Sequence, residues 1–95
     1  MDSEQKVLYQ IKVFGRVQGV GFRQGCMREA RFRGVCGYVK NNSDGSVYIE
    51  AEGTEDQLKQ IIEWCKHGPS GYSFVEDIAV EKGKPVHHSS FIIKY

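Results

Sequence analysis

The sequence has few of the features that mark membrane, secreted or metal-built proteins. No apolar run approaches the roughly 20 residues that a membrane-spanning helix needs. The first ten residues, MDSEQKVLYQ, lack the basic and then apolar regions of a signal peptide, so we expect a cytoplasmic chain. The cysteines are odd in number and lack metal-like spacing, which argues against a zinc site and a disulfide framework. A single disulfide between two of them remains an alternative; the cysteines are Cys26, Cys36 and Cys65.

An excess of charge of either sign is also lacking. The chain has 13 basic and 12 acidic residues and a formal net charge of +1. Such a balance provides no global attraction to nucleic acid or to an anionic membrane, so neither is predicted as a partner. Ninety-five residues suffice for one core and are too few for two. We therefore expect one domain over residues 1–95, with its core from about residue 7 onward, that acts as a monomer.

Apolar periodicity predicts the secondary structure. In residues 22–33, Phe22, Cys26 and Ala30 recur at the four-residue spacing of one helical face. A second helix begins after Thr54, which forms a capping-box pattern with Gln57, and ends at Gly68-Pro69. Alternation of apolar and polar residues predicts strands, with an Asp-Gly hairpin turn between the second and third. These strands cover residues 7–13, 35–41, 46–53, 75–80 and 91–95.

The element order is β-α-β-β-α-β with a short extra strand at the end. Each half is a split β-α-β unit, which predicts a ferredoxin-like α+β sandwich with two helices on one face of an antiparallel sheet. Residues 81–90 are polar and contain a proline, so we expect an exposed loop in which the adjacent His87 and His88 are solvated. This fold carries many unrelated functions and does not by itself indicate an activity.

The stretch GRVQGVGFR, residues 15–23, joins the first strand to the first helix. Its glycines allow successive N–H groups to turn inward as a nest, and the helix start adds free N–H groups and a positive dipole end. Such a concavity favours a phosphate-like anion, on which Arg23 could place two donors. The alternative is a tight turn with a solvated arginine. The stretch is neither a Walker A loop nor a dinucleotide fingerprint.

The full string resembles the signature of the acylphosphatase family, small enzymes that hydrolyse the carboxyl–phosphate bond of acyl phosphates. A second block, residues 37–41 with residues 44–47, matches the other motif of that family at the expected separation. A looser match, Glu52-Gly53 before the second helix and Gly68-Pro69 after it, extends the resemblance over nearly the whole chain.

The resemblance implies the ferredoxin-like fold, an acyl phosphate substrate, inorganic phosphate as product and competitive inhibitor, and no metal or other cofactor. It implies that Arg23 and Asn41 are the catalytic residues, with Asn41 holding the attacking water. It also implies that Arg23 and the loop amides bind phosphate; the loop residues are Gly15, Arg16, Val17, Gln18, Gly19 and Val20. The physiological acyl group is not indicated.

Two departures from the family pattern concern the first helix. Gln24-Gly25-Cys26 follows the key arginine where bulkier side chains are expected. Arg33 stands where an apolar residue is usually buried, and Phe32 is the residue that could compensate. Both departures bear on helix stability and on the placement of the loop more than on the chemistry.

Two other functions compete with this interpretation. RNA-recognition motifs share the fold, but the strand 46–52 reads SVYIEAE, and its acidic residues would repel phosphate. Acylphosphatase-like domains also begin larger hydrogenase-maturation proteins that handle carbamoyl phosphate. No zinc-finger cysteines follow here, so a free-standing hydrolase is preferred, and a non-catalytic anion-binding domain is the alternative.

Overall fold

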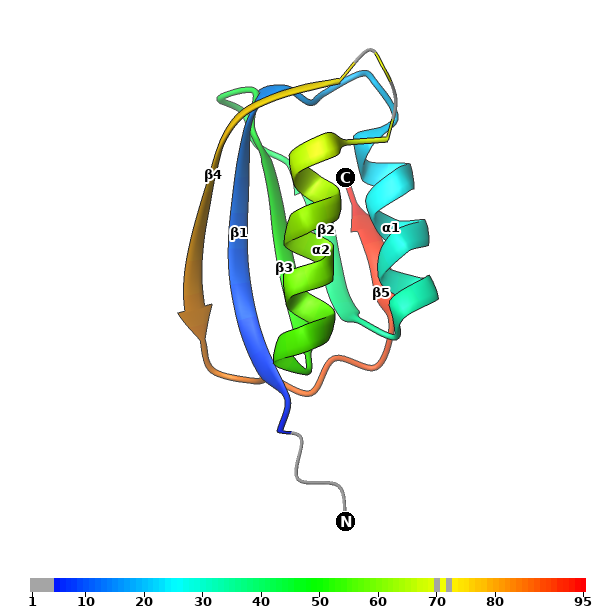
Figure 1. Cartoon of the computed structure of the whole chain (residues 1–95), viewed down its shortest axis with the longest axis vertical. Coiled ribbons are helices and arrows are strands. Elements are labelled where there is room, and N and C mark those ends of the chain that lie inside the picture. The colour runs from blue at the N-terminus through cyan, green and yellow to red at the C-terminus, as the bar shows by residue number, and fades with distance from the viewer. Residues whose placement is uncertain (1–4, 70, 72) are drawn as a thin grey trace.

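The computed structural model describes residues 5–69, 71 and 73–95. Figure 1 shows two helices lying side by side across one face of a sheet. The helices are α1 (Phe22–Arg33) and α2 (Glu55–His67). The strands are β1 (Val7–Arg16), β2 (Cys36–Asn41), β3 (Val47–Gly53), β4 (Phe74–Gly83) and β5 (Phe91–Lys94).

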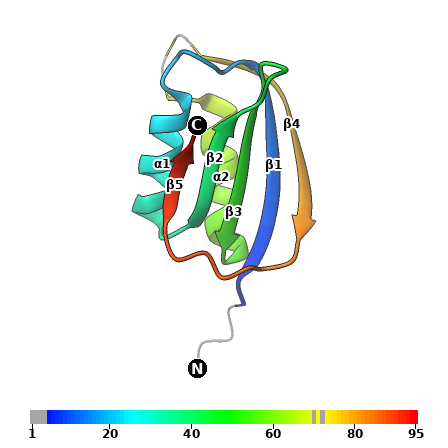
Figure 2. The ribbon, with the colours of Figure 1, turned by 180° about the vertical axis from the view of Figure 1, so that it is seen from behind.

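In the described part of the chain the strands form one five-stranded sheet in the order β4-β1-β3-β2-β5. The pairs β4-β1, β1-β3 and β3-β2 are antiparallel, whereas β5 runs parallel to β2. Seen from behind, the other face of the sheet carries no helix (Figure 2). The expected ferredoxin-like sandwich with its extra strand is therefore confirmed.

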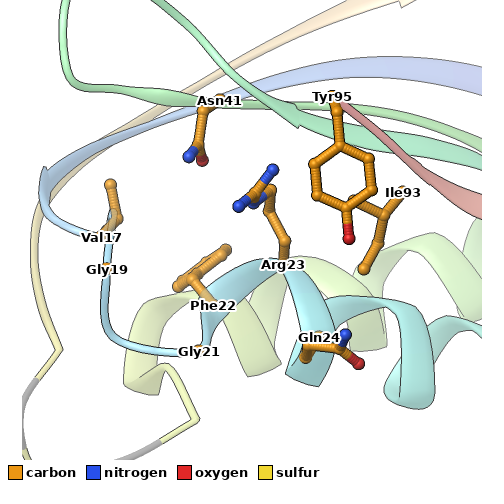
Figure 3. Close-up of a pocket in the computed structure, with 9 residues that line it drawn as sticks. All are labelled: Val17, Gly19, Gly21, Phe22, Arg23, Gln24, Asn41, Ile93 and Tyr95. Carbon is orange, nitrogen blue, oxygen red and sulfur yellow. The ribbon is translucent and has the colours of Figure 1, made fainter.

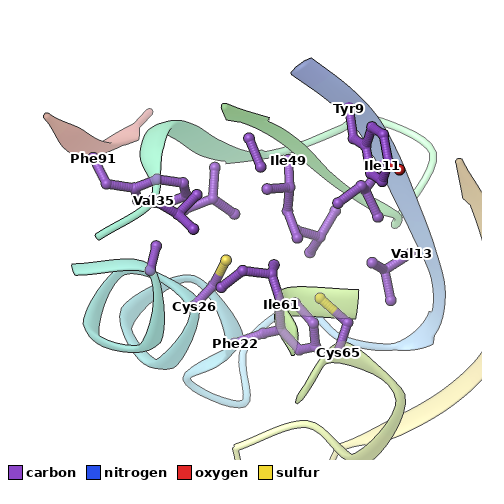
Figure 4. Packing of buried hydrophobic residues seen from close by; sticks show 14 of the residues in the cluster. Tyr9, Ile11, Val13, Phe22, Cys26, Val35, Ile49, Ile61, Cys65 and Phe91 are labelled. Carbon is purple, nitrogen blue, oxygen red and sulfur yellow. The ribbon is translucent and has the colours of Figure 1, made fainter. Parts of the chain in front are cut away.

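The core lies between the sheet and the two helices (Figure 4). On β1, the residues Tyr9, Ile11 and Val13 face the helices and Lys12 lies on the other face, as the period-2 pattern predicts. The helices contribute fully buried residues at helical spacing: Phe22, Cys26, Ala30, Leu58, Ile61 and Cys65. The three cysteines are free thiols, and burial raises the pKa of the Cys65 thiol to about 12.

Two expectations for the segment after β4 are wrong. The strand continues to Gly83 because its backbone pairs with β1 as far as Leu8, so the exposed loop is shorter than expected. His87 is exposed, but His88 is half-buried, and its Nε2 lies 2.8 Å from Glu50 Oε2. The buried Glu52 accepts hydrogen bonds from the backbone N–H groups of both histidines. Burial by itself would raise the pKa of Glu52, and these amide hydrogen bonds outweigh it and lower the pKa.

The two departures on α1 have different outcomes. Gly25 is buried beneath Trp64 and Pro69, where an added Cβ would lie 2.9 Å from atoms of both side chains. A glycine here lets α1 approach the end of α2, so it serves the packing of the helices. The expected compensation by Phe32 is wrong, since its side chain is 79 % exposed. Arg33 instead binds Glu29, with 2.6 Å between Nε and Oε2, and also donates to Gln60.

No helix among the described residues is long and apolar enough to cross a membrane.

Candidate active site

The site begins where β1 bends at its end. The pairing of β1 with β4 shifts register between Phe14 and Gly15, which marks a β-bulge. Gly15 has a φ of 131°, and a Cβ there would lie 2.2 Å from the carbonyl oxygen of Phe74. Only glycine allows this approach of the two strands. Gly15 and Arg16 therefore belong to β1, which ends three residues later than the strand end expected from the sequence.

The loop after β1 is attached to the β2–β3 turn. The side-chain Nε2 of Gln18 donates to the carbonyl oxygens of Asn42, at 2.8 Å, and Ser46, at 2.9 Å. Val17 is fully buried next to it, and Val20 packs partly against the core. These contacts hold the loop beside the end of β2.

The β2–β3 turn is itself held by hydrogen bonds. Asp44 Oδ1 accepts from the backbone N–H and the hydroxyl of Ser46, and Lys12 Nζ lies 3.2 Å from Asp44 Oδ2. The hydrogen bonds from Ser46, with the help of Lys12, lower the pKa of Asp44 to about 2. Because Gln18 binds the same turn, the turn and the loop after β1 form one connected unit.

The N-terminus of α1 has no side-chain cap. Gly21 is its N-cap residue, with a φ of 79° and a ψ of 16°, and no acidic residue lies in the first turn. The first N–H groups of a helix have no partner within the helix, and they carry its positive dipole end. This helix end therefore offers donors and positive potential without a competing carboxylate.

A pocket of about 130 Å³ opens between this helix end, the loop and the ends of β2 and β5 (Figure 3). That volume is room for several water-sized groups. It is lined by Val17, Gly19, Gly21, Phe22, Arg23, Gln24, Asn41, Ile93 and Tyr95. None of these described lining residues has a carboxylate side chain.

Arg23 and Asn41 come together in this pocket although 18 positions separate them in the sequence. Figure 3 shows the guanidinium of Arg23, from α1, and the amide of Asn41, from the end of β2, pointing toward one another. The Oδ1 atom of Asn41 is buried and has no hydrogen-bond partner among the described residues. A buried carbonyl oxygen without a partner is costly unless a water or ligand satisfies it. Asn41 is therefore placed to hold such a group opposite Arg23.

The other predicted residues divide into two sets. Val17 and Gly19 line the pocket with Arg23 and Asn41. Four predicted residues are not among the lining residues; they are Gly15, Arg16, Gln18 and Val20. Gly15 and Gln18 nonetheless shape the loop by the bulge and the turn contacts described above.

Part of the pocket wall was not predicted from the sequence. Ile93 and Tyr95 reach it because β5 pairs with β2, which carries Asn41. The Tyr95 ring centroid lies 4.9 Å from Cζ of Arg23, a cation–π contact. The sequence offers no local signal for this approach, because strand order is set by tertiary packing. Gly21 and Gln24 also line the pocket. Because they lie in or next to the stretch 15–23, the sequence could have predicted both as site residues.

Among the described residues no group of three or more His, Cys, Asp or Glu side chains could hold a metal ion.

Known proteins are similar to this chain in sequence and in fold. The acylphosphatase family model matches residues 9–93. An acylphosphatase from Synechococcus sp. (strain RCC307) is 48 % identical over 63 residues, which are 66 % of this chain and 54 % of that protein. The acylphosphatase of Bacillus subtilis (strain 168) is 47 % identical over 88 residues, 92 % of this chain and 96 % of that protein.

Solved structures agree. A crystal structure of acylphosphatase from Bacillus subtilis superposes with a TM-score of 0.90 at 46 % identity, covering 94 % of this chain and 99 % of that one. Full-length HypF in a phosphate- and nucleotide-bound form superposes with a TM-score of 0.92 at 35 % identity, over 99 % of this chain and 12 % of HypF. From its sequence and its fold, this chain belongs to the acylphosphatase family.

Proposed function

We propose that this acylphosphatase binds the phosphoryl group of an acyl phosphate in the pocket between the 17–21 loop, Arg23 and Asn41. The open N–H groups at the start of α1 and the guanidinium of Arg23 are donors suited to the oxygens of a phosphoryl group. Of the loop predicted to bind phosphate, the main chain at Val17 and Gly19 lines the pocket and forms the cradle with Arg23 in this proposal. Gly15 and Gln18 keep its shape through the bulge and the turn contacts.

The unpartnered buried Oδ1 of Asn41 is the observation that carries the proposed mechanism. This oxygen accepts a hydrogen bond from the attacking water and aims it at phosphorus, while Arg23 holds the phosphoryl group. The water oxygen forms a bond to phosphorus as the bond to the acyl oxygen breaks. An acyl phosphate dianion and water thereby give a carboxylate and dihydrogen phosphate, so the protons of the water stay on the phosphate.

This reaction needs little from the protein beyond position and charge. The leaving group is a carboxylate, whose conjugate acid has a pKa near 4, so no general acid is required. Phosphoryl transfer runs through a loose transition state in which positioning and charge stabilisation supply most of the catalysis. Because Arg23 and main-chain amides supply the positive charge, the proposed reaction uses no metal ion or other cofactor.

The proposal also covers the setting in which the enzyme works. Residues 1–95 act as a single acylphosphatase domain, as a monomer in the cytoplasm, on small acyl phosphates. Nucleic acid and membranes are not partners in this proposal. The near-neutral charge of the chain supports the exclusion of nucleic acid and membranes.

The first experiment measures hydrolysis of acetyl phosphate and benzoyl phosphate by the purified protein, with and without a chelator. We expect both to be hydrolysed, with rates that the chelator leaves unchanged, and inorganic phosphate to inhibit competitively. A protein that binds inorganic phosphate but hydrolyses neither compound would instead be a non-catalytic anion-binding domain. Kinetics unaffected by high phosphate would contradict the proposed cradle.

Asn41→Ala tests the water-positioning step. We expect kcat to fall by about 10²- to 10³-fold, since preorganised hydrogen-bonding groups in active sites have effects of that size. The inhibition constant for inorganic phosphate should change little, because the cradle is intact. A parallel loss of turnover and phosphate affinity would make Asn41 a structural turn residue.

A further inference from the structure

The pocket has two unlike sides. Main chain from the glycine-rich loop forms one side, with Gly19 and Gly21. Side chains form the opposite side: Gln24 from α1, Ile93 from β5 and Tyr95 just after β5. Figure 3 shows these three beyond Arg23, away from Val17 and Gly19. The first side suits a charged group, and the second offers apolar surface and an aromatic ring.

Tyr95 and the proposed phosphate site share Arg23. The ring centroid of Tyr95 is 4.9 Å from Cζ of that arginine. A group bonded to a phosphate held by Arg23 therefore starts within reach of the ring. The side chain of Tyr95 is 95 % exposed, so the ring face turned away from the guanidinium is open to a ligand.

We propose that Tyr95 and Ile93, with Gln24 at the edge, form the acyl-group subsite, and that it selects aromatic acyl phosphates over acetyl phosphate. The inference rests on the proposed function, because it assumes that the phosphoryl group lies against Arg23. An aromatic acyl group packs against the Tyr95 ring and covers the half-buried Ile93, whereas an acetyl group is too small to cover both. Pairs of aromatic rings contribute roughly a three- to tenfold gain in affinity beyond the area they bury.

Tyr95 could alternatively act only by holding Arg23, and kinetics separates the two roles. Substitution of a residue that only positions Arg23 changes kcat/KM for every substrate, and the inhibition constant for inorganic phosphate, by the same factor. A residue that contacts the acyl group changes the ratio between substrates. The ratio of kcat/KM for benzoyl phosphate to kcat/KM for acetyl phosphate is therefore the deciding quantity.

The experiment compares the wild type with Tyr95→Ala and Tyr95→Phe on both substrates. We expect Tyr95→Ala to lower the benzoyl-to-acetyl ratio by roughly three- to tenfold. Tyr95→Phe should keep the ratio, because the ring remains. Phe32→Ala is the matched control, since Phe32 is an exposed aromatic residue on α1 that also lies beside an arginine, with 5.5 Å between its ring centroid and Cζ of Arg33. An unchanged ratio in Tyr95→Ala, or an equal loss for both substrates and for phosphate inhibition, would overturn the subsite.

A binding measurement keeps this test separate from turnover. Phenacylphosphonate and acetonylphosphonate carry the same two acyl groups on a phosphonate that the enzyme cannot cleave. Calorimetry should show tighter binding of the phenacyl compound, and Tyr95→Ala should remove that preference. Equal binding of the two compounds by the wild type would overturn the subsite whether or not the protein is an active hydrolase. Failure of hydrolysis with a retained preference would contradict only the proposed function.

Discussion

The two helices of this protein begin in opposite ways, and only one beginning lies at the proposed active site. Thr54 caps α2 with a complete capping box, in which it accepts from the Gln57 N–H at 3.2 Å and donates its own N–H to Gln57 Oε1 at 2.9 Å. Glu55 and Asp56 add negative charge in the first turn. The start of α1 has Gly21 without a side-chain cap, no acidic residue, and Arg23 in the first turn. Figure 1 shows the two starts at opposite ends of the molecule.

The start of α2 therefore contributes to the stability of the fold, whereas the start of α1 contributes to the proposed function. At α2 the capping box gives the N–H groups of Thr54 and Gln57 partners within the chain, and two acidic residues complement the helix dipole. At α1 there is no side-chain cap and no carboxylate in the first turn, and in the proposed function a phosphoryl group accepts from these N–H groups. A helix start without a cap is less stable, and the proposed function requires it because a cap would occupy the N–H groups that bind the anion.

Among the variants that test this comparison, Arg23→Ala should have the largest effect on activity. It removes the fixed cation from the α1 start, and we expect kcat/KM to fall on the order of 10³-fold or more, the range for arginines that stabilise phosphoryl transfer. Phosphate inhibition should be lost as well. Arg28→Ala changes an exposed arginine of the same helix and should leave both quantities unchanged. A loss of less than tenfold in Arg23→Ala would make the arginine peripheral to the reaction.

Gly21→Asp should convert the start of α1 toward the α2 type. Nothing lies within 4 Å of a Cβ built on Gly21, and Asp and Asn are the residues that best tolerate its positive φ. Gly21→Asn is the matched neutral variant. We expect the aspartate to weaken phosphate inhibition by about tenfold relative to the asparagine, through repulsion between like charges. Equal inhibition constants for the two variants would show that phosphate binds elsewhere.

Thr54→Ala should have the smallest effect of these variants, and that effect should be on stability alone. Loss of the cap costs about 1 kcal/mol in the free energy of unfolding. In a domain of this size that loss lowers Tm by about 4–8 °C. Thr54→Ser keeps the hydroxyl and serves as the control in thermal unfolding. Because this helix start is far from the pocket, kcat/KM should not change, and a drop in activity would contradict the separation described above.

The sequence predicted the features of the fold that depend on residues close together along the chain. The helix over 22–33 has the predicted bounds because its apolar spacing, its uncapped glycine start and its terminal arginines are all local. The capping box at Thr54 is confirmed for the same reason. The fold class followed from the order of such elements.

What the sequence could not predict depends on neighbours distant along the chain. Strand β1 extends to Arg16 because β4 lies against it. Tyr95 reaches Arg23 because β5 adds beside β2, and the sequence does not show which strand β5 pairs with. His88 was expected in solvent, but carboxylates on β3 hold it and its backbone against the sheet.

A titration of the ¹⁵N-labelled protein with inorganic phosphate, followed by amide NMR, tests the central claim most directly. The account predicts that the amide resonances of residues 17–23 shift and saturate together, at the concentration at which phosphate inhibits the enzyme. The amides of residues 54–57, at the capped start of α2, should not move. Equal shifts at both helix starts, or shifts that leave residues 17–23 unmoved, would contradict it.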